Sequence, residues 1–265
     1  ASQISTIDGI TTLNYVKNID SSDVYDLDLS DCKEISILGG EPSIDLNVRK
    51  FIDYVAEKYT DVAVMITTNA TNASDSWLNT LKRLCMGKKL QIVLSVDAVG
   101  PTQEYQRKSK IPWSKIRNNI LKYKEASAGH DNCHLNIQCT LTSINLVTID
   151  KWWDEMMDFN IDVHVNPVHQ PFPLSVSAIP PELKNKSVEW LKNWLLQFPV
   201  KKESTDITVR NKIWTTTNVI NVLKNTEFNV ENLHKFQSAT RKLDTIRGED
   251  IIKLDDRFSS MLDKK

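Results

Sequence analysis

The chain has 265 residues and a formal net charge of −1, with 34 acidic and 33 basic side chains interspersed along it. This balance lacks the basic surface typical of nucleic-acid-binding proteins, and no apolar run is long enough to span a bilayer. No signal segment of the secretory type is recognisable at the start, so we expect a cytoplasmic protein without a nucleic-acid or membrane partner.

The four cysteines are scattered along the chain, at Cys32, Cys85, Cys133 and Cys139. No C-x-x-C pair and no Cys/His cluster occurs, so we expect no structural metal site. Cys133 and Cys139 are close in sequence, but both fall on one expected strand, which holds them too far apart to bond. We therefore expect all four to be reduced thiols that pack as small apolar residues.

In chain order, the first expected element is a weak helix at about Ile7–Ile19, and strand and helix patterns alternate after it. The expected strands are Glu34–Leu38, Val62–Thr67, Leu90–Ser95, Cys133–Leu141 and Ile161–Val165. The expected amphipathic helices are Asp45–Tyr59, Ser74–Cys85, one starting at Trp113, and Thr148–Phe159. This alternation predicts an α/β fold with parallel, sequentially adjacent strands joined by helical crossovers.

The pattern changes near Gln170, where four prolines punctuate a linker and no strand pattern follows. The expected helices beyond it are Pro181–Gln197, about Ile207–Lys224, about Val230–Ile246, and a short one near the end. We therefore expect a barrel-like domain over residues 1–170 and a helical C-terminal extension over residues 171–265.

The first strand after the N-terminal segment runs directly into Gly39-Gly40-Glu41-Pro42. The two glycines let the main chain approach a ligand closely, Glu41 supplies an acceptor for a cation, and Pro42 stiffens the exit. Ligands of parallel α/β folds bind at the carboxyl ends of the strands. The polar residues at the other expected strand ends are Asn69, Ser95, Asp97, Gln138 and Asn166. The competing interpretation is that any strand becomes polar where it enters a loop. No nucleophile–base set, G-x-G-x-x-G pattern or P-loop is found.

Three of these segments together resemble the radical S-adenosylmethionine (SAM) superfamily. Gly39-Gly40-Glu41-Pro42 is similar to its GGEP motif, Thr67-Thr68-Asn69 to its T-x-N element, and Ser95-Val96-Asp97 to its S-x-D strand end. The tail Lys242–Gly248 resembles the end of the twitch-domain-containing subgroup. The resemblance covers most of Leu29–Val168 and implies a partial TIM-like (β/α) barrel. In intact relatives, this barrel cleaves SAM reductively to a 5′-deoxyadenosyl radical.

The resemblance also implies roles for individual residues. Gly39, Gly40 and Glu41 would line the amino group of SAM, and Ser95 and Asp97 would hydrogen-bond its ribose hydroxyls. Arg107 would pair with the SAM carboxylate. The residues expected on the same rim, in contact with SAM or substrate, are Asn69, Gln138 and Asn166. The alternatives are an ordinary glycine turn, a helix cap after a strand, and a surface ion pair.

The chain departs from the family in its cysteines. Relatives hold a [4Fe–4S] cluster on a C-x-x-x-C-x-x-C loop after their first strand, and this sequence has only Cys32 before Gly39. We therefore expect a barrel portion that lacks the first strand and the cluster loop, a fragment that is inactive as it stands. The alternatives are a non-catalytic, cluster-less binding or scaffold protein on the same barrel, or an unrelated α/β protein.

Without a preceding strand, Glu34–Leu38 is expected at the edge of the sheet. Exposed strand edges tend to find a partner. We expect this edge to be covered by the N-terminal segment or to pair with a second copy of the chain. The substrate is not indicated by the sequence.

Overall fold

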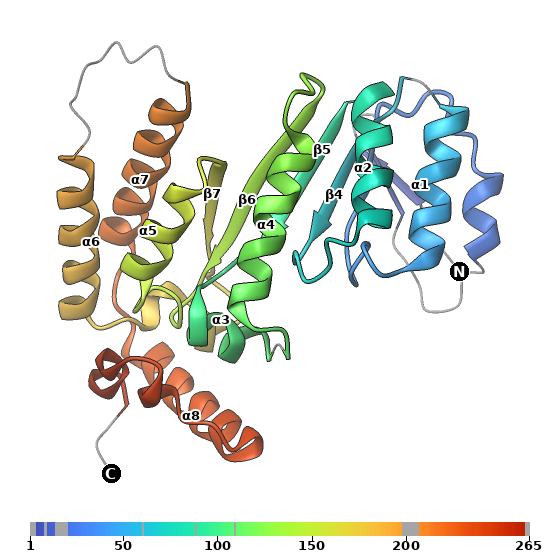
Figure 1. Cartoon of the computed structure of the whole chain (residues 1–265). Coiled ribbons are helices and arrows are strands. Elements are labelled where there is room, and N and C mark those ends of the chain that lie inside the picture. The colour runs from blue at the N-terminus through green and yellow to red at the C-terminus, as the bar shows by residue number, and fades with distance from the viewer. Residues whose placement is uncertain are drawn as a thin grey trace. The chain divides into compact units, whose positions relative to one another are not determined.

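A computed structural model describes residues 4–7, 10–13, 21–59, 61–87, 89–108, 110–197 and 207–262. Its main feature is a five-stranded parallel sheet in which the strands follow one another in sequence order (Figure 1). The strands are β3 (Glu34–Ile37), β4 (Ala63–Thr68), β5 (Leu90–Ser95), β6 (Cys133–Leu141) and β7 (Asp162–Pro167).

Helices connect these strands as the sequence predicts for successive βα units. They are α1 (Leu46–Lys58), α2 (Asp75–Gly87), α3 (Gly100–Arg107), α4 (Trp113–Ser127) and α5 (Ile149–Asp158). The α/β class, the parallel strand order and the alternation of strands with helices are confirmed. α3 was not predicted, because this short and mostly polar helix has little apolar periodicity, although Pro101 marks its first turn.

The C-terminal part is helical, as expected. It contains α6 (Pro181–Leu195), α7 (Ile207–Asn225) and α8 (Val230–Arg247), followed by two short 3₁₀ turns at Ile251–Lys253 and Asp256–Ser260. Within the described part of residues 171–262, no strand follows β7.

The predicted N-terminal helix is wrong where the structure describes it. Strands β1 (Ile4–Ile7) and β2 (Ile10–Leu13) form an antiparallel pair in a separate two-stranded sheet. The segment is rich in isoleucine and threonine, whose branched Cβ atoms favour extended backbone over helix. Residues 14–19 of the predicted helix lie outside the described residues.

The chain divides into two compact units, each assembled from two stretches of sequence. Unit 1 comprises Ala1–Leu94 and Asn118–Leu135, and unit 2 comprises Ser95–Arg117 and Asn136–Lys265. In unit 1 the fully buried Trp77 of α2 donates from Nε1 to the hydroxyl of Tyr123 of α4, at 2.8 Å. In unit 2 the core includes the adjacent Trp152 and Trp153 of α5, and Trp153 also contacts the ring of Trp194 on α6 edge to face.

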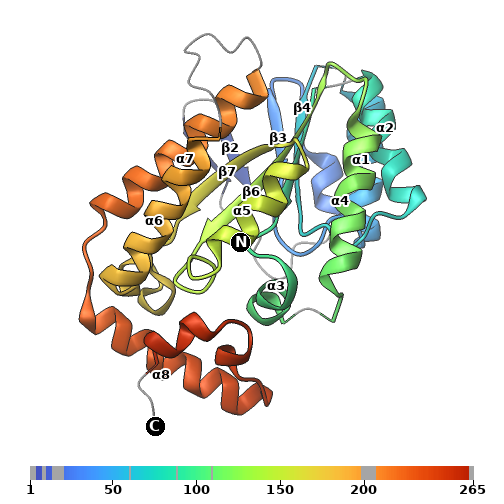
Figure 2. The ribbon, with the colours of Figure 1, turned by 60° about the vertical axis from the view of Figure 1, so that its left-hand side comes forward.

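The two outer strands of the sheet differ in what lies beside them. α7 packs beside β7, as Figure 2 shows, and the Thr215 hydroxyl donates to the carbonyl of Val163 at 2.8 Å. At β3, the side chains of Glu34 and Ser36 are exposed, and those of Ile35 and Ile37 are only half-buried. β1 and β2 do not join β3, so among the described strands it pairs with β4 alone. The prediction that Glu34–Leu38 forms an edge strand is thereby confirmed for this part of the chain.

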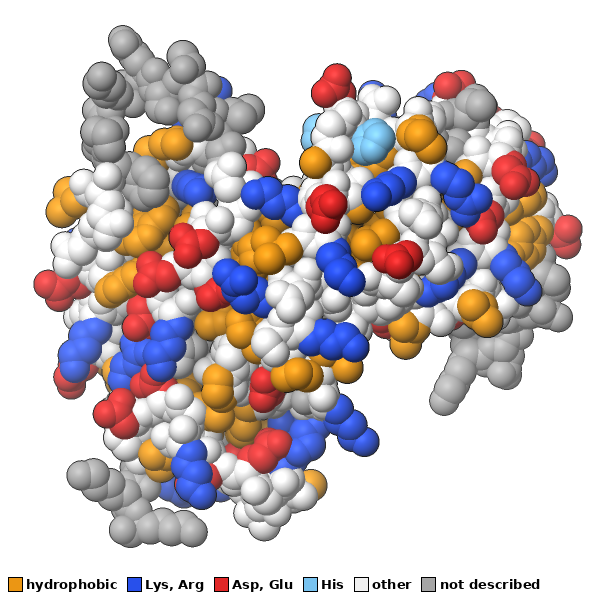
Figure 3. Space-filling view, viewed as in Figure 1, with side chains coloured by type: hydrophobic (Ala, Val, Ile, Leu, Met, Phe, Trp, Pro, Cys, Tyr) orange, Lys and Arg blue, Asp and Glu red, His pale blue; other side chains and the backbone are white. Residues whose placement is uncertain are grey.

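Charge and membrane character agree with the composition. Lys, Arg, Asp and Glu side chains are interspersed over the face shown in Figure 3, without a large patch of one sign. None of the described helices is both long enough and apolar enough to cross a membrane.

Candidate functional site

The loop after β3 presents its main chain openly. Gly39 and Gly40 adopt φ angles of +87° and +57°, in the left-handed region that glycine occupies without strain. Both residues are exposed, and a Cβ atom built on either one would meet nothing within 4 Å. This part of the chain can therefore receive a ligand against the backbone.

Glu41 ties this loop to the end of β4. Its Oε1 accepts hydrogen bonds from the Thr68 hydroxyl and from the Ser43 main-chain N–H, and its Oε2 accepts from the Asn69 main-chain N–H at 2.8 Å. The Asn69 side chain in turn accepts from the Thr71 N–H and hydroxyl. The carboxylate is therefore already hydrogen-bonded by the chain, and its first role is to fix two strand-end loops to each other.

The β4 loop is also anchored from α4. Asn119 donates to the carbonyl of Ala70, and the Tyr123 hydroxyl donates to the carbonyl of Asn72, each at 2.8 Å. Burial is the main cause that raises the pKa of Tyr123, so the phenol stays protonated and remains a donor near neutral pH.

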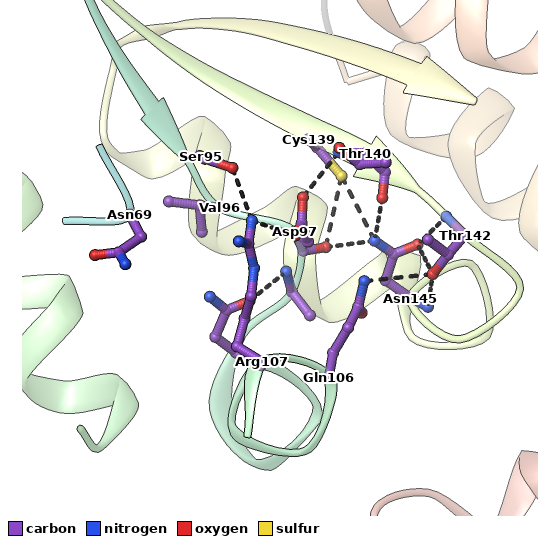
Figure 4. Close-up of polar contacts among 12 residues, drawn as sticks. Asn69, Ser95, Val96, Asp97, Gln106, Arg107, Cys139, Thr140, Thr142 and Asn145 are labelled. Atoms are coloured by element: carbon purple, nitrogen blue, oxygen red, sulfur yellow. Dashed lines mark hydrogen bonds and ion pairs between the residues drawn. The ribbon is translucent and has the colours of Figure 1, made fainter. Parts of the chain in front are cut away.

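In unit 2, Asp97 is the centre of a hydrogen-bonded cluster just after β5 (Figure 4). Asp97 is buried, with 5% of its surface exposed. Its Oδ2 pairs with Nη2 of Arg107 at 2.5 Å, and its Oδ1 accepts a hydrogen bond from the Thr140 N–H at 2.9 Å. The same Arg107 nitrogen donates to the Ser95 hydroxyl at 2.7 Å. The Arg107 side chain is 35% exposed, so solvent reaches this guanidinium group.

Asn145 completes this cluster from the loop after β6. Its Nδ2 donates to the carbonyls of Asp97 and Thr140, and its Oδ1 accepts from the Thr142 N–H (Figure 4). The buried Cys139 thiol also donates to the Asp97 carbonyl, and burial raises the pKa of that thiol. Asn145 was not among the site residues predicted from the sequence. The Thr-Ser-Ile-Asn turn after the strand is the signal that could have found it, because threonine and asparagine hydrogen-bond the main chain in turns.

The C-terminal tail holds α3, which carries Arg107. The Tyr105 hydroxyl donates to Asp244 at 2.9 Å, and Arg247 donates to the Tyr105 carbonyl at 3.0 Å. Lys108 pairs with Glu249 at 2.6 Å. Burial, followed by the Asp244 hydrogen bond, raises the pKa of Tyr105. Contacts made by Tyr105 and Lys108, which precede and follow Arg107 in the sequence, therefore set the position of α3.

The structure brings together some of the predicted site residues and leaves others apart. Glu41 and Asn69 are joined in unit 1, and Ser95, Asp97 and Arg107 are joined in unit 2. Gln138 is half-buried on β6, and its carbonyl accepts from the Val96 N–H. Asn166 is exposed on β7, in register with Thr140.

The residues present do not fit an iron–sulfur cluster. All four thiols are free; Cys85 and Cys139 are buried, and the Cys139 thiol donates to the Asp97 carbonyl. Such clusters need several thiolates on one side of the metal. Over the described ranges, no three His, Cys, Asp or Glu side chains gather closely enough to hold a metal ion.

Comparisons with known proteins give matches only among solved structures. No family model and no curated protein matches the chain. The structure of Streptococcus suis SuiB bound to S-adenosylmethionine aligns with 62% of this chain and 35% of its own, at 18% identity and a TM-score of 0.42. Native anSMEcpe with bound S-adenosylmethionine aligns with 62% of this chain and 47% of its own, at 20% identity and a TM-score of 0.43. A Coxiella burnetii dihydropteroate synthase in complex with pteroic acid aligns at 15% identity with a TM-score of 0.29. The chain spans less than half the length of the first two proteins.

Proposed function

We propose that this chain is the SAM-binding barrel portion of a radical SAM enzyme of the twitch-domain-containing subgroup. The proposal rests on the positions of three motif segments in the fold. Gly39-Gly40-Glu41-Pro42, Thr67-Thr68-Asn69 and Ser95-Val96-Asp97 stand at the carboxyl ends of β3, β4 and β5. These are consecutive strands of one parallel sheet, and the carboxyl ends of such strands are where α/β folds bind ligands. In this proposal the barrel portion is residues 1–170 and the helical extension is residues 171–265.

Each residue has a role that its chemistry supports. The open main chain at Gly39 and Gly40 would accept from the ammonium group of SAM, and Arg107 would pair with the carboxylate group. Ser95 and Asp97 would face the ribose, and Asn69, Gln138 and Asn166 would contact SAM or substrate. When bound beside a reduced cluster, SAM supplies a carbon radical that abstracts hydrogen; this chain would bind and orient it.

In this proposal, these 265 residues alone do not catalyse the cleavage of SAM. The cysteines do not converge on a cluster, so no electron donor for SAM is present among them. Activity would require a longer cytoplasmic form that carries the cluster ligands upstream.

A second candidate is a cluster-less binding or scaffold protein on the same barrel. One observation favours it: the carboxylates of Glu41 and Asp97 are both hydrogen-bonded within the chain itself. In this candidate the motif residues hold loops together and bind no cofactor.

Calorimetry with SAM and S-adenosylhomocysteine separates the two candidates. The first candidate predicts weak binding, with a Kd of about 0.1–1 mM, or about −5.5 to −4 kcal/mol, because metal chelation of the amino acid moiety is missing. Arg107→Ala should weaken SAM binding at least about tenfold, since it removes one charge-assisted hydrogen bond. Arg83→Ala is the control, because it removes an ion-paired arginine of α2 whose partner, Asp53 of α1, lies 2.6 Å away. No heat of binding at millimolar ligand would favour the scaffold candidate.

A further inference from the structure

A small cavity lies between α5 and α6 in unit 2, two helices that run side by side in Figure 1 and Figure 2. Its volume is about 160 Å³. The walls come from the turn before α5, the first residues of α5, one side of α6, Ile179 and Arg257. None of the residues assigned to SAM lines this cavity, so the SAM site does not explain it.

The inner walls of the cavity are apolar. Five of the apolar wall residues are at most 8% exposed, and the sixth, a tryptophan of α6, is half-buried. An apolar cavity of about 150 Å³ takes up one benzene molecule. These walls therefore suit one apolar group of that size, such as a branched aliphatic side chain. The apolar wall residues are Leu146, Val147, Ile149, Ile179, Leu183 and Trp190.

An acidic side chain lines the cavity from α5. Asp150 is 28% exposed, and its Oδ1 lies 3.1 Å from Nη1 of Arg257, in the one ion pair or hydrogen bond that its side chain makes over the described ranges. Arg257 is also held by Asp255, which accepts from Nε at 2.7 Å and from Nη2 at 2.8 Å. The guanidinium group is thus committed to two carboxylates, and Asp150 keeps an oxygen that can accept from a cation.

A basic side chain lines the cavity from α6. Lys186 pairs with Glu182 at 2.8 Å, and the two side chains are 66% and 79% exposed. Such an exposed pair contributes little to stability, so the lysine can turn toward a ligand. Leu183 and Trp190 precede and follow Lys186 by about one helical turn, so all three lie along one face of α6. An acid on α5 and a base on α6 therefore border one apolar space.

We propose that this cavity binds a free apolar α-amino acid about the size of leucine. The ammonium group of the ligand pairs with Asp150, its carboxylate group pairs with Lys186, and its side chain fills the apolar walls. A hydrocarbon would leave both charges unused, and a simple anion would meet the carboxylate of Asp150. The proposal does not depend on SAM binding, because the two sites share no residue.

Calorimetry with L-leucine and the native full chain tests this proposal. We expect one saturable site per chain, with a Kd of about 1 mM or lower. N-acetyl-L-leucine has no ammonium group and should bind at least about tenfold more weakly, because it cannot pair with Asp150. L-leucinamide has no carboxylate group and should bind about threefold more weakly, since Lys186 is exposed. Glycine, which has no apolar side chain, should give no heat of binding at the same concentrations.

Substitution of the acidic residue locates the ammonium group. Asp150→Asn keeps the shape of the side chain and should weaken L-leucine binding at least about tenfold. It should also abolish the preference for L-leucine over N-acetyl-L-leucine, which a merely structural role of Asp150 would not do. Asp154→Asn is the matched control, because Asp154 lies one turn further along α5, is exposed and does not line the cavity.

Substitution of the basic residue locates the carboxylate group. Lys186→Gln changes an exposed side chain, so the variant should fold normally and bind L-leucine about threefold more weakly. It should bind L-leucinamide as the wild type does. Lys192→Gln is the matched control, because this exposed lysine of the same helix does not line the cavity.

Three results would overturn the proposal: no heat of binding with L-leucine at about 10 mM, equal affinity for N-acetyl-L-leucine, or unchanged L-leucine binding by Asp150→Asn. Arg107→Ala should bind L-leucine as the wild type does. A loss of L-leucine binding in Arg107→Ala would place the amino acid at the other site and would also overturn the proposal. Since L-leucine and SAM are titrated separately, failure of one proposal is distinguishable from failure of the other.

Discussion

Asp97 shows how one carboxylate can hold together the end of a strand. It is buried, and its two oxygens bind the guanidinium group of Arg107 and the main chain of Thr140. Asp97→Asn keeps the shape of the side chain but removes the charge that balances Arg107. We expect a loss of about 1–3 kcal/mol in the free energy of unfolding, because the arginine is left partly buried without its partner.

Urea denaturation measures this change, and Asp53→Asn is its control. Asp53 pairs with Arg83 at a similar distance, 2.6 Å, but both side chains are exposed, at 41% and 58%. Removal of an exposed pair should change stability by no more than about 1 kcal/mol. Equal effects of the two substitutions would contradict the central role given to Asp97.

Asp255 gives a prediction for acid stability. Both of its oxygens accept from Arg257, and Lys151 lies 2.8 Å away. The hydrogen bonds from Arg257 hold the pKa of Asp255 well below its usual range. Since the pKa is lowered in the folded state, the stabilisation is complete above the unfolded pKa of about 3.9 and is lost as the pH falls toward the folded value.

Asp255→Asn should therefore destabilise the protein by about 1–2 kcal/mol at pH 7, with a difference from wild type that shrinks as the pH falls below about 4. Chemical denaturation at a series of pH values measures this. Glu182→Gln is the control, because Glu182 pairs with Lys186 on an exposed helix surface. A stability difference between Asp255→Asn and wild type that stays constant from pH 7 into the acid range would contradict this dependence of stability on the ionisation of Asp255.

Two glycines at the ends of helices differ in their backbone conformation. Gly248 ends α8 at φ +64°, whereas Gly87 is the last residue of α2 and has no such left-handed angle; a Cβ would find open space at both. Gly248→Ala should therefore cost about 1 kcal/mol through backbone strain alone. Gly87→Ala should be neutral or stabilising by up to about 1 kcal/mol. Thermal unfolding of the two variants checks the opposite signs.

The outer strand β3 leads to a proposal about self-association. Three large apolar side chains around its end are highly exposed: Leu38 at 63%, Ile44 at 65% and Leu46 at 67%. We propose that β3 pairs with a second copy of the chain, because an open strand edge offers unpaired main-chain groups.

Light scattering should show that the average mass rises with protein concentration, and Leu38→Lys should suppress this rise. Leu196→Lys, which changes another exposed leucine at the end of α6, should not. A monomer at every concentration would remove this proposal.

The sequence predicted some elements closely because their signals are local. Leu90–Ser95 and Cys133–Leu141 match β5 and β6 to the residue, since the first is a mostly apolar segment and the second alternates apolar with polar residues. The N-terminal helix was wrong where the structure describes the segment, because its isoleucine and threonine residues favour extended backbone. The partners of Glu41 and Asp97 were missed because a motif does not show which way a side chain turns.

For the molecule as a whole, the placement of the thiols gives a prediction about iron. Anaerobic reconstitution with iron and sulfide should give no stoichiometric [4Fe–4S] absorbance, because no three cysteine, histidine or acidic side chains of the described residues gather closely enough to hold a metal ion. Iron analysis and the visible spectrum measure this. About four irons per chain with cluster absorbance would contradict the prediction.

The unequal edges of the sheet also determine the symmetry of any assembly that the sheet could form. α7 and the Thr215 hydroxyl already occupy the free side of β7, so that strand cannot receive β3 from another copy without displacing a helix. Head-to-tail growth through β3 and β7 of this sheet, as the described residues show it, is therefore blocked. Two copies can still meet β3 to β3 about a two-fold axis, in antiparallel orientation. Such a pair uses the β3 edge of both chains, so among the described strands of this sheet no open edge is left for a third copy.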